Sequence, residues 1–192
     1  MSSDALWAKA ASAPVGVSRV VYDESAIQHR VLQLGQEISH DYHGKDLLVV
    51  GILKGAVVFT SDLIRHLSIP ISLDFIAISN YTPALKTGEV RILKDLEEDV
   101  GRRHLLLIED IVDTGLSLNY LARMMLNRDP ASLAVCTLLD RPDLRLVEVP
   151  LRYVGFRVTQ EFLVGYGLDY RNHYRQLPYI GTMRFDQEVS TQ

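Results

Sequence analysis

The chain has 192 residues, of which 47% are hydrophobic and 23% charged, and its formal net charge is −4 with a pI near 5.8. These values are ordinary for one globular domain with a substantial core. The sequence has no long basic run and no apolar run of membrane-spanning length, which argues against general nucleic-acid affinity and against a membrane span. We therefore expect neither nucleic acid nor a membrane as a partner.

The two ends of the chain read as extensions of a single domain. Residues 1–16 are rich in Ala and Ser, but Asp4 and Lys9 interrupt them, so they do not resemble a signal peptide. We expect a mobile extension over residues 1–16, a domain over 17–185 and a tail over 186–192. The single cysteine, Cys136, lies in an apolar run and is expected to be buried. One cysteine cannot form an internal disulfide, which fits the cytoplasm.

Apolar spacing in the first half of the chain predicts two helices and two strands. Ser25 is typical of an N-cap, and apolar residues at helical spacing continue to about Tyr42. An apolar strand follows over residues 46–53. A second helix begins near Val58 and is stopped by Pro70. A further strand is expected over residues 71–79.

The second half continues the alternation of strands and helices. A polar loop over residues 80–88 and a returning strand over 89–93 suggest a long hairpin. A buried strand is expected at 105–108, a helix after Gly115 and another strand at 133–139, with short strands near 153–156, 161–164 and 179–182. The alternation favours an α/β fold with a central, mostly parallel sheet flanked by helices.

The strongest chemical signal is a cluster of polar residues directly after the apolar run 105–108. It comprises Glu109, Asp110, Asp113, Thr114, Gly115 and Ser117. Buried carboxylates need a metal, sugar hydroxyls or a proton to offset their charge. Hydroxyls and backbone N–H groups at a helix N-terminus suit a phosphate. One acid could simply cap the helix, but a cap does not need three. The combination fits a sugar phosphate.

Three polar segments follow predicted strands of the same sheet. They are Lys54-Gly55, residues 109–117 and Asp140-Arg141. Ligands bind beyond the carboxyl ends of parallel strands in such sheets. We therefore expect the three segments to converge on one site.

Residues 108–115, Ile-Glu-Asp-Ile-Val-Asp-Thr-Gly, resemble the phosphoribosyl-diphosphate-binding signature of the type I phosphoribosyltransferases. Residues 53–55, 88–95, 138–142, 154–156 and 161–170 resemble segments of the hypoxanthine phosphoribosyltransferases. The resemblance spans about residues 17–183. It implies the type I phosphoribosyltransferase fold, with a small hood subdomain and a flexible catalytic loop, and association into a homodimer or homotetramer.

The resemblance also implies a reaction in which a nucleobase displaces diphosphate from phosphoribosyl diphosphate, with Mg²⁺. Glu109 and Asp110 would hold the ribose hydroxyls, and Asp113 would act as general base near purine N7. The 5-phosphate would be bound by Thr114, Gly115, Leu116 and Ser117. Some relatives have a lysine in place of Leu116, where a backbone role tolerates the change.

The resemblance assigns the remaining site residues to the diphosphate, the metal and the purine. Lys54, Gly55 and Arg175 would bind diphosphate, and the peptide bond between Lys54 and Gly55 can be cis in relatives. Asp169, with Glu109 and Asp110, would serve Mg²⁺. Phe162 would stack on the purine, the Leu163 backbone would face its exocyclic edge, and Arg141 stands where many relatives use a lysine toward the 6-oxo group.

The catalytic loop would carry Asn80 and Tyr81, where relatives commonly have Ser-Tyr. The expected substrates are therefore phosphoribosyl diphosphate and a 6-oxopurine, either hypoxanthine or guanine. Two alternatives stay open at this point. One is an enzyme that prefers xanthine, and the other is a non-catalytic regulator with the same fold, although such regulators tend to carry a basic face that this sequence lacks.

Overall fold

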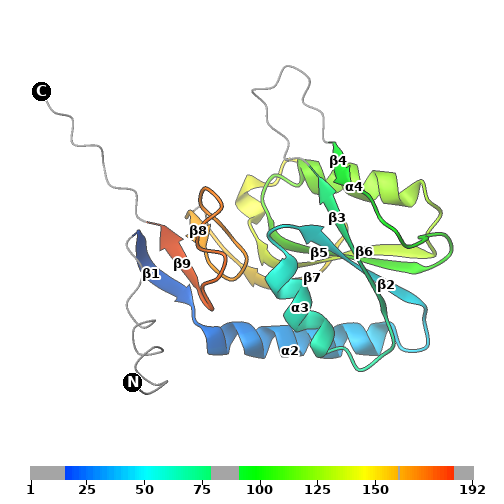
Figure 1. The fold of residues 1–192 in the computed structure, drawn as a ribbon, viewed down its shortest axis with the longest axis horizontal. Helices are drawn as coiled ribbons and strands as arrows, with labels where there is room; N and C mark the ends of the chain where they lie inside the picture. Colours follow the sequence, from blue (N-terminus) through cyan, green and yellow to red (C-terminus); the bar gives the residue numbers. More distant parts are fainter. Residues whose placement is uncertain (1–15, 79–90, 160, 184–192) are drawn as a thin grey trace, which may run out of the picture.

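The computed structural model describes residues 16–78, 91–159 and 161–183, which form a large and a small β-sheet side by side (Figure 1). The large sheet has the order β4-β3-β2-β5-β6-β7, and the small sheet the order β1-β9-β8. The large sheet consists of β2 (Leu47–Leu53), β3 (Ser72–Ile78), β4 (Ile92–Lys94), β5 (His104–Val112), β6 (Ser132–Asp140) and β7 (Leu151–Arg157). The small sheet consists of β1 (Val17–Tyr22), β8 (Leu163–Val164) and β9 (Ile180–Met183).

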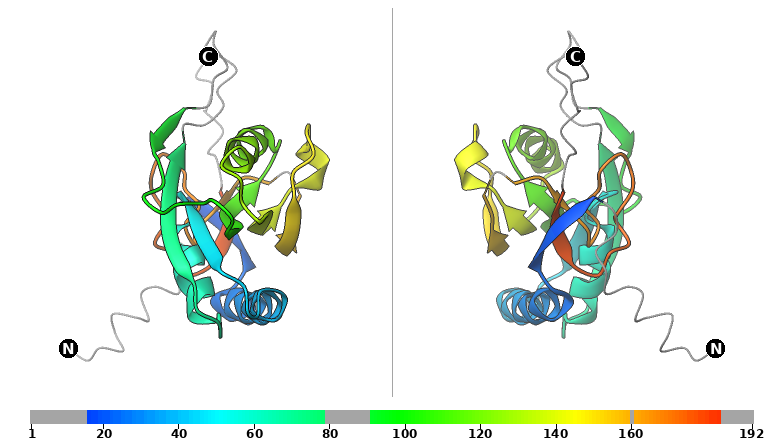
Figure 2. Two further views of the ribbon diagram at one scale, coloured as in Figure 1. Left: turned by 90° about the vertical axis from the view of Figure 1, so that its right-hand side faces the viewer. Right: turned by 90° about the vertical axis from the view of Figure 1, so that its left-hand side faces the viewer.

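The large sheet is mostly parallel, as the alternation of strands and helices predicts. Strands β3, β2, β5, β6 and β7 are parallel to their neighbours, and only β4 is antiparallel, to β3. Helices α2 (Glu24–Asp41) and α3 (Val57–Arg65) cover one face, and α4 (Leu116–Leu126) covers the other (Figure 2). None of the described helices is long and apolar enough to cross a membrane.

Successive residues of the central strands serve opposite faces of the sheet. Val49 and Leu106 pack with α2 and α3, whereas Val50 and Leu107 pack with α4. All four are fully buried. Burial on both faces explains why these strands are continuous apolar runs rather than alternating ones. Cys136 is buried on the α2 side, as expected, and burial raises the pKa of its thiol.

Several boundaries differ from the predictions. Helix α2 is capped by Asp23 rather than Ser25, because the Asp23 carboxylate accepts a hydrogen bond from the backbone N–H of Ala26 at 2.8 Å. Helix α3 ends at Arg65, well before Pro70. The C-cap residue, His66, packs closely against Gly35 of α2, where an added Cβ would lie 2.6 Å from the His66 Cβ and 2.8 Å from its carbonyl oxygen.

Strand β5 runs to Val112, four residues past its predicted end. Glu109 and Ile111 still pair with Thr137 and Leu139 of β6, so these residues extend the ladder instead of forming a turn. Strand β8 begins at Leu163, later than the predicted start.

The sequence prediction missed β1 completely. This strand pairs antiparallel with β9, from Val17 opposite Met183 to Tyr22 opposite Ile180, with two irregularities in register. Its burial pattern does not alternate with a period of two, which removes the usual sign of a strand. The expected extension over residues 1–16 falls outside the described residues except for Gly16, and the tail over 186–192 falls outside them entirely. The domain limits stay a prediction.

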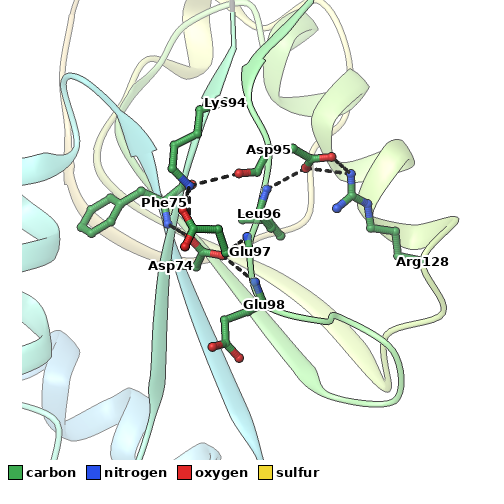
Figure 3. Close-up of polar contacts among 8 residues, drawn as sticks. All are labelled: Asp74, Phe75, Lys94, Asp95, Leu96, Glu97, Glu98 and Arg128. Carbon is green, nitrogen blue, oxygen red and sulfur yellow. Dashed lines mark hydrogen bonds and ion pairs between the residues drawn. The ribbon is translucent and has the colours of Figure 1, made fainter.

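The antiparallel edge of the large sheet is fixed by a polar cluster around Asp74, drawn in Figure 3. The Asp74 carboxylate is buried and accepts from the backbone N–H groups of Phe75, Glu97 and Glu98 at 2.6–2.9 Å. Lys94 of β4 approaches the same carboxylate at 3.4 Å. The returning strand is therefore held by hydrogen bonds and charge as well as by its short ladder with β3. The antiparallel pairing agrees with the predicted hairpin, but the strand spans Ile92–Lys94 rather than 89–93, and the loop over 80–88 lies outside the described residues.

Candidate active site

A cavity of about 800 Å³ lies at the carboxyl ends of β2 and β5. Every predicted site residue within the described ranges lines it. These residues are Lys54, Gly55, Glu109, Asp110, Asp113, Thr114, Gly115, Leu116, Ser117, Arg141, Phe162, Leu163, Asp169 and Arg175. Asn80 and Tyr81 lie outside the described residues. The three polar segments that follow strands thus converge, as the parallel sheet predicts.

Glu109 and Asp110 form the acidic floor of the cavity. The backbone N–H of Asp110 donates to the Glu109 carboxylate at 3.1 Å, and that of Ile111 donates to the Asp110 carboxylate at 2.8 Å. Burial, together with the Asp110 charge, raises the pKa of Glu109 well above its ordinary value. Burial also raises the pKa of Asp110, although the Arg175 charge opposes this. Such a pair is ready to accept hydrogen bonds from a diol or to face a cation.

Asp113 lies just beyond β5 and is held by Arg141. The Arg141 Nη1 atom lies 3.2 and 3.3 Å from the two carboxylate oxygens of Asp113, and its Nη2 donates to the backbone carbonyl of Glu161. Arg141 is largely buried, whereas Asp113 stays partly open to the cavity. The guanidinium therefore connects the predicted general base to the residue that precedes Phe162.

The turn that follows Asp113 leads into the N-terminus of α4. Gly115 precedes the helix with φ of 79°, a left-handed conformation that favours glycine. The Thr114 hydroxyl accepts from the Leu116 backbone N–H at 3.4 Å. Turn amides and a helix N-terminus at the cavity wall form a site suited to a phosphate group.

Lys54 and Gly55 follow β2 at the opposite wall. The cis peptide bond joins Leu53 to Lys54, one position earlier than the expected bond between Lys54 and Gly55. A Cβ on Gly55 would lie 1.7 Å from the Asp110 carboxylate, so only glycine fits against the acidic floor. A Cβ on Gly167 would in turn lie 2.1 Å from the Gly55 carbonyl oxygen, so the segment between β8 and β9 lies directly on this loop. We call the small sheet and this segment the hood.

Arg175 and Asp169 form an ion pair at the rim, with 2.6 Å between Nη2 and Oδ1. Arg175 also donates through Nη1 to the Gly167 carbonyl at 2.6 Å. Its charge faces the acidic floor and acts on Asp110. The arginine can thus offer a cation to an anionic ligand while Asp169 offers a carboxylate to a metal.

Phe162 and Leu163 form the hood side of the cavity. The Phe162 ring is 43% exposed and meets Tyr170 edge to face, with 5.7 Å between centroids. Leu163 is buried in β8 and pairs with Thr182 of β9. The Phe162 carbonyl accepts from the backbone N–H of Met183 at 2.9 Å. An exposed aromatic ring on a fixed backbone suits stacking with a planar ligand.

Sequence reasoning missed the apolar part of the wall. Ile78, Ile111, Leu146 and Leu168 line the same cavity. Ile111 could have been found, because it lies inside the acidic motif at the end of a strand. Leu146 could not, since it reaches the cavity only through the irregular segment between β6 and β7.

Comparison with known proteins agrees with this geometry. The family model of the phosphoribosyl transferase domain matches residues 20–171. A hypoxanthine-guanine phosphoribosyltransferase of Mycobacterium tuberculosis is 45% identical over 177 residues, covering 88% of each chain. The chain belongs to the hypoxanthine phosphoribosyltransferase family.

Other members of the hypoxanthine phosphoribosyltransferase family agree in sequence and structure. A hypoxanthine phosphoribosyltransferase of Salmonella typhimurium is 42% identical over 165 residues, covering 84% of this chain and 93% of the relative. The crystal structure of one from Staphylococcus aureus superposes with a TM-score of 0.85 at 43% identity, covering 88% of this chain and 92% of that chain. The chain is therefore an enzyme of purine salvage with the type I phosphoribosyltransferase fold.

Proposed function

We propose that this enzyme transfers the 5-phosphoribosyl group from phosphoribosyl diphosphate to N9 of hypoxanthine and guanine, giving IMP or GMP and diphosphate. The observation that carries the proposal is the convergence of four kinds of group on one cavity. An acidic floor, a turn suited to phosphate, three cationic side chains (Lys54, Arg141 and Arg175) and an exposed aromatic ring all line it. Family membership supports the same reaction, because the relatives are named for hypoxanthine or for hypoxanthine and guanine.

The acidic floor and the turn bind the sugar phosphate in this proposal. Glu109 and Asp110 accept hydrogen bonds from the 2- and 3-hydroxyls and face a ribose ring that becomes cationic as the bond to diphosphate breaks. Residues 114–117 donate backbone and hydroxyl hydrogen bonds to the 5-phosphate. Lys54 and Arg175 stabilise the negative charge of the departing diphosphate.

The hood side binds the purine. Phe162 stacks on the ring, the Leu163 backbone faces the exocyclic edge, and Arg141 donates to the 6-oxo group. Asp113 takes or shares the proton at N7 while N9 attacks the C1 carbon. Its open side toward the cavity and its contact with Arg141 are consistent with this role.

Mg²⁺ fits the donor set of the cavity. Within the described ranges, no group of three or more His, Cys, Asp or Glu side chains is arranged to hold a metal. Mg²⁺ commonly uses one or two carboxylates, substrate phosphates and water. We propose that Asp169, with Glu109 and Asp110 on the sugar side, serves the ion, which when bound neutralises charge on the diphosphate. We also propose that the enzyme is cytoplasmic. We further propose that it forms a homodimer or homotetramer, and sedimentation of the purified enzyme would test this oligomeric state.

The test is a steady-state assay with phosphoribosyl diphosphate, Mg²⁺ and each free purine in turn. We expect IMP from hypoxanthine and GMP from guanine, with diphosphate released in equal amount. Competition among hypoxanthine, guanine and xanthine would give the order of preference. Absence of any nucleotide product would reject the proposal, and a clear preference for xanthine would reject its substrate assignment.

A further inference from the structure

The phosphate-binding turn is supported from behind by the segment that follows β6. Three consecutive carbonyl groups of the turn, those of Val112, Asp113 and Thr114, accept hydrogen bonds from this segment. The backbone N–H of Arg141 donates to the Val112 carbonyl at 3.0 Å. The backbone N–H groups of Leu146 and Val147 both donate to the Thr114 carbonyl, at 3.0 and 3.3 Å. The middle carbonyl, that of Asp113, accepts from a side chain instead.

That side chain is Arg145. Its Nε donates to the Asp113 carbonyl at 2.9 Å, and its Nη2 donates to the Val112 carbonyl at 3.2 Å. The same Nη2 forms an ion pair with the Asp140 carboxylate. Its Cδ lies 3.1 Å from where a Cβ on Gly115 would be. One planar fork thus joins the end of β6 to the residue that carries the predicted base.

Arg145 acts from outside the cavity. It is not among the residues that line the cavity, whereas its neighbour Leu146 is. The side chain is 15% exposed and that of Asp140 is 9% exposed, so each charge depends on the other. An arginine held in this way fixes geometry and does not touch a substrate.

We propose that Arg145 is a positioning residue for phosphoribosyl transfer, a role that rests on the proposed function. By holding the carbonyls of Val112 and Asp113, it sets the direction of the turn amides that face the 5-phosphate and the place of the Asp113 carboxylate. A lysine keeps the charge but cannot make the forked contact. Small displacements of groups that position a substrate lower the rate steeply.

The experiment compares Arg145→Lys with Arg103→Lys in the full-length enzyme. Arg103 is a matched control, because its side chain is also 15% exposed and also forms ion pairs. It lies just before β5, at the end of the strand opposite the cavity, and binds Asp46, Ser72 and Glu98. Both variants lose an arginine fork of similar burial, but only one fork contacts the turn.

We expect both variants to lower the melting temperature. Only Arg145→Lys should raise KM for phosphoribosyl diphosphate and lower kcat, each by about tenfold. Hydrogen exchange should also become faster at the amides of residues 114–117 in that variant alone. The inference is wrong if Arg145→Lys keeps native kinetic constants or changes them no more than Arg103→Lys does.

A second variant, together with the wild-type assay, gives an outcome in every case. If Arg145→Lys does not fold, Asp140→Asn removes the charge partner while leaving volume and backbone bonds in place, and it should shift the same KM in the same direction. Native kinetics in a folded Asp140→Asn would overturn the inference. Failure of the proposed function is separable, because it would appear as absence of phosphoribosyl transfer in the wild-type enzyme.

Discussion

Asp113 is the residue on which the two sides of the cavity meet. Its carboxylate contacts Arg141 on the side that we propose for the purine, and its carbonyl contacts Arg145 behind the turn that we propose for the 5-phosphate. The side chain and the backbone of one residue therefore have separate supports. This separation allows the chemistry of the carboxylate to be changed without releasing the turn.

Replacing Asp113 by Asn tests its role as the base. The amide keeps the size of the side chain but cannot take a proton, so we expect kcat to fall by about 10² to 10⁴. Binding of phosphoribosyl diphosphate, measured by calorimetry, should change little because the turn stays in place. Asp143→Asn is the control, since Asp143 is an exposed neighbour on the short helix after β6 (Pro142–Leu144). Near-native turnover in D113N would contradict the assignment.

Gly55 offers a second test at the scale of one residue. In Gly55→Ala, the new Cβ would meet the Asp110 carboxylate, so the acidic floor or the loop must shift. Overpacking of this kind costs about 1–3 kcal/mol, and KM for phosphoribosyl diphosphate should rise. In Gly101→Ala, the nearest atom is 3.5 Å from the new Cβ, so this variant should keep native kinetics. Equal behaviour of the two variants in the steady-state assay would refute the close fit.

At the scale of the element, Asp74 holds β4 to β3 and shows how one carboxylate can fix an edge strand (Figure 3). Burial alone would raise the pKa of Asp74. The backbone N–H groups of Glu98, Phe75 and Glu97 and the charge of Lys94 outweigh this and hold the pKa below its ordinary value. The native state therefore binds the proton more weakly than the unfolded chain does, and stability from Asp74 is complete at neutral pH.

Asp74→Asn should destabilise the enzyme by about 1–3 kcal/mol at neutral pH, because backbone donors lose a charged acceptor. The difference from the wild type should shrink as the pH falls below about 4 and Asp74 becomes protonated in the native state too. Urea unfolding of both proteins across acid and neutral pH measures this. Asp129→Asn, an exposed carboxylate in the loop after α4, should show no such pH-dependent difference. A constant difference between wild type and D74N at every pH would contradict the assignment.

The central strands and helices could be predicted because burial leaves a clear apolar signal. Their ends could not, because they are set by contacts between distant segments. Strand β5 reaches Val112 only because β6 continues beside it. Helix α2 begins at Glu24 rather than after Ser25, because Asp23 serves as the cap. The sequence therefore predicts that the polar segments converge on one site. It does not predict that residues 109–112 continue the strand instead of forming a turn.

At the scale of the whole molecule, the hood subdomain is tied to the large sheet by Tyr166 and Asp62. The Tyr166 hydroxyl donates to the Asp62 carboxylate of α3 at 2.7 Å, and Gln28 of α2 donates to the same oxygen at 2.8 Å. Burial and the Asp62 carboxylate raise the pKa of Tyr166, so the hydroxyl stays a donor at neutral pH. This bond connects the hood to α3, the helix that follows Lys54 and Gly55.

Tyr166→Phe should weaken that connection with little change of volume. We expect a loss of about 1.5–3 kcal/mol in urea unfolding, as for a hydrogen bond to a charged group. KM for hypoxanthine should also rise, because the segment from Gly165 to Leu168 continues from Phe162. Tyr120→Phe, at an exposed position on α4, is the control and should change neither quantity. Native stability in Tyr166→Phe would show that the bond does not hold the hood.

The hood was the least predictable part of the molecule from local patterns. Its strands are short or irregular, and β1 and β9 pair across nearly the full length of the described chain. The short strands expected near 161–164 and 179–182 are present as β8 and β9, but no pattern predicted β1 or its pairing with β9. The place of residues 113–117 at the cavity could be predicted from the sequence alone, because polar groups are concentrated there in a few consecutive positions.

The pairing of β1 with β9 has a consequence for synthesis of the enzyme. While the chain is still emerging from the ribosome, the large sheet can already assemble, because its strands are complete by Arg157. The wall that we propose for the purine has to wait until Met183 has left the exit tunnel, joined Val17 and bonded to the Phe162 carbonyl. A nascent chain halted before that point would have the acidic floor and the turn after β5, but it would lack Arg175, Asp169 and a fixed Phe162.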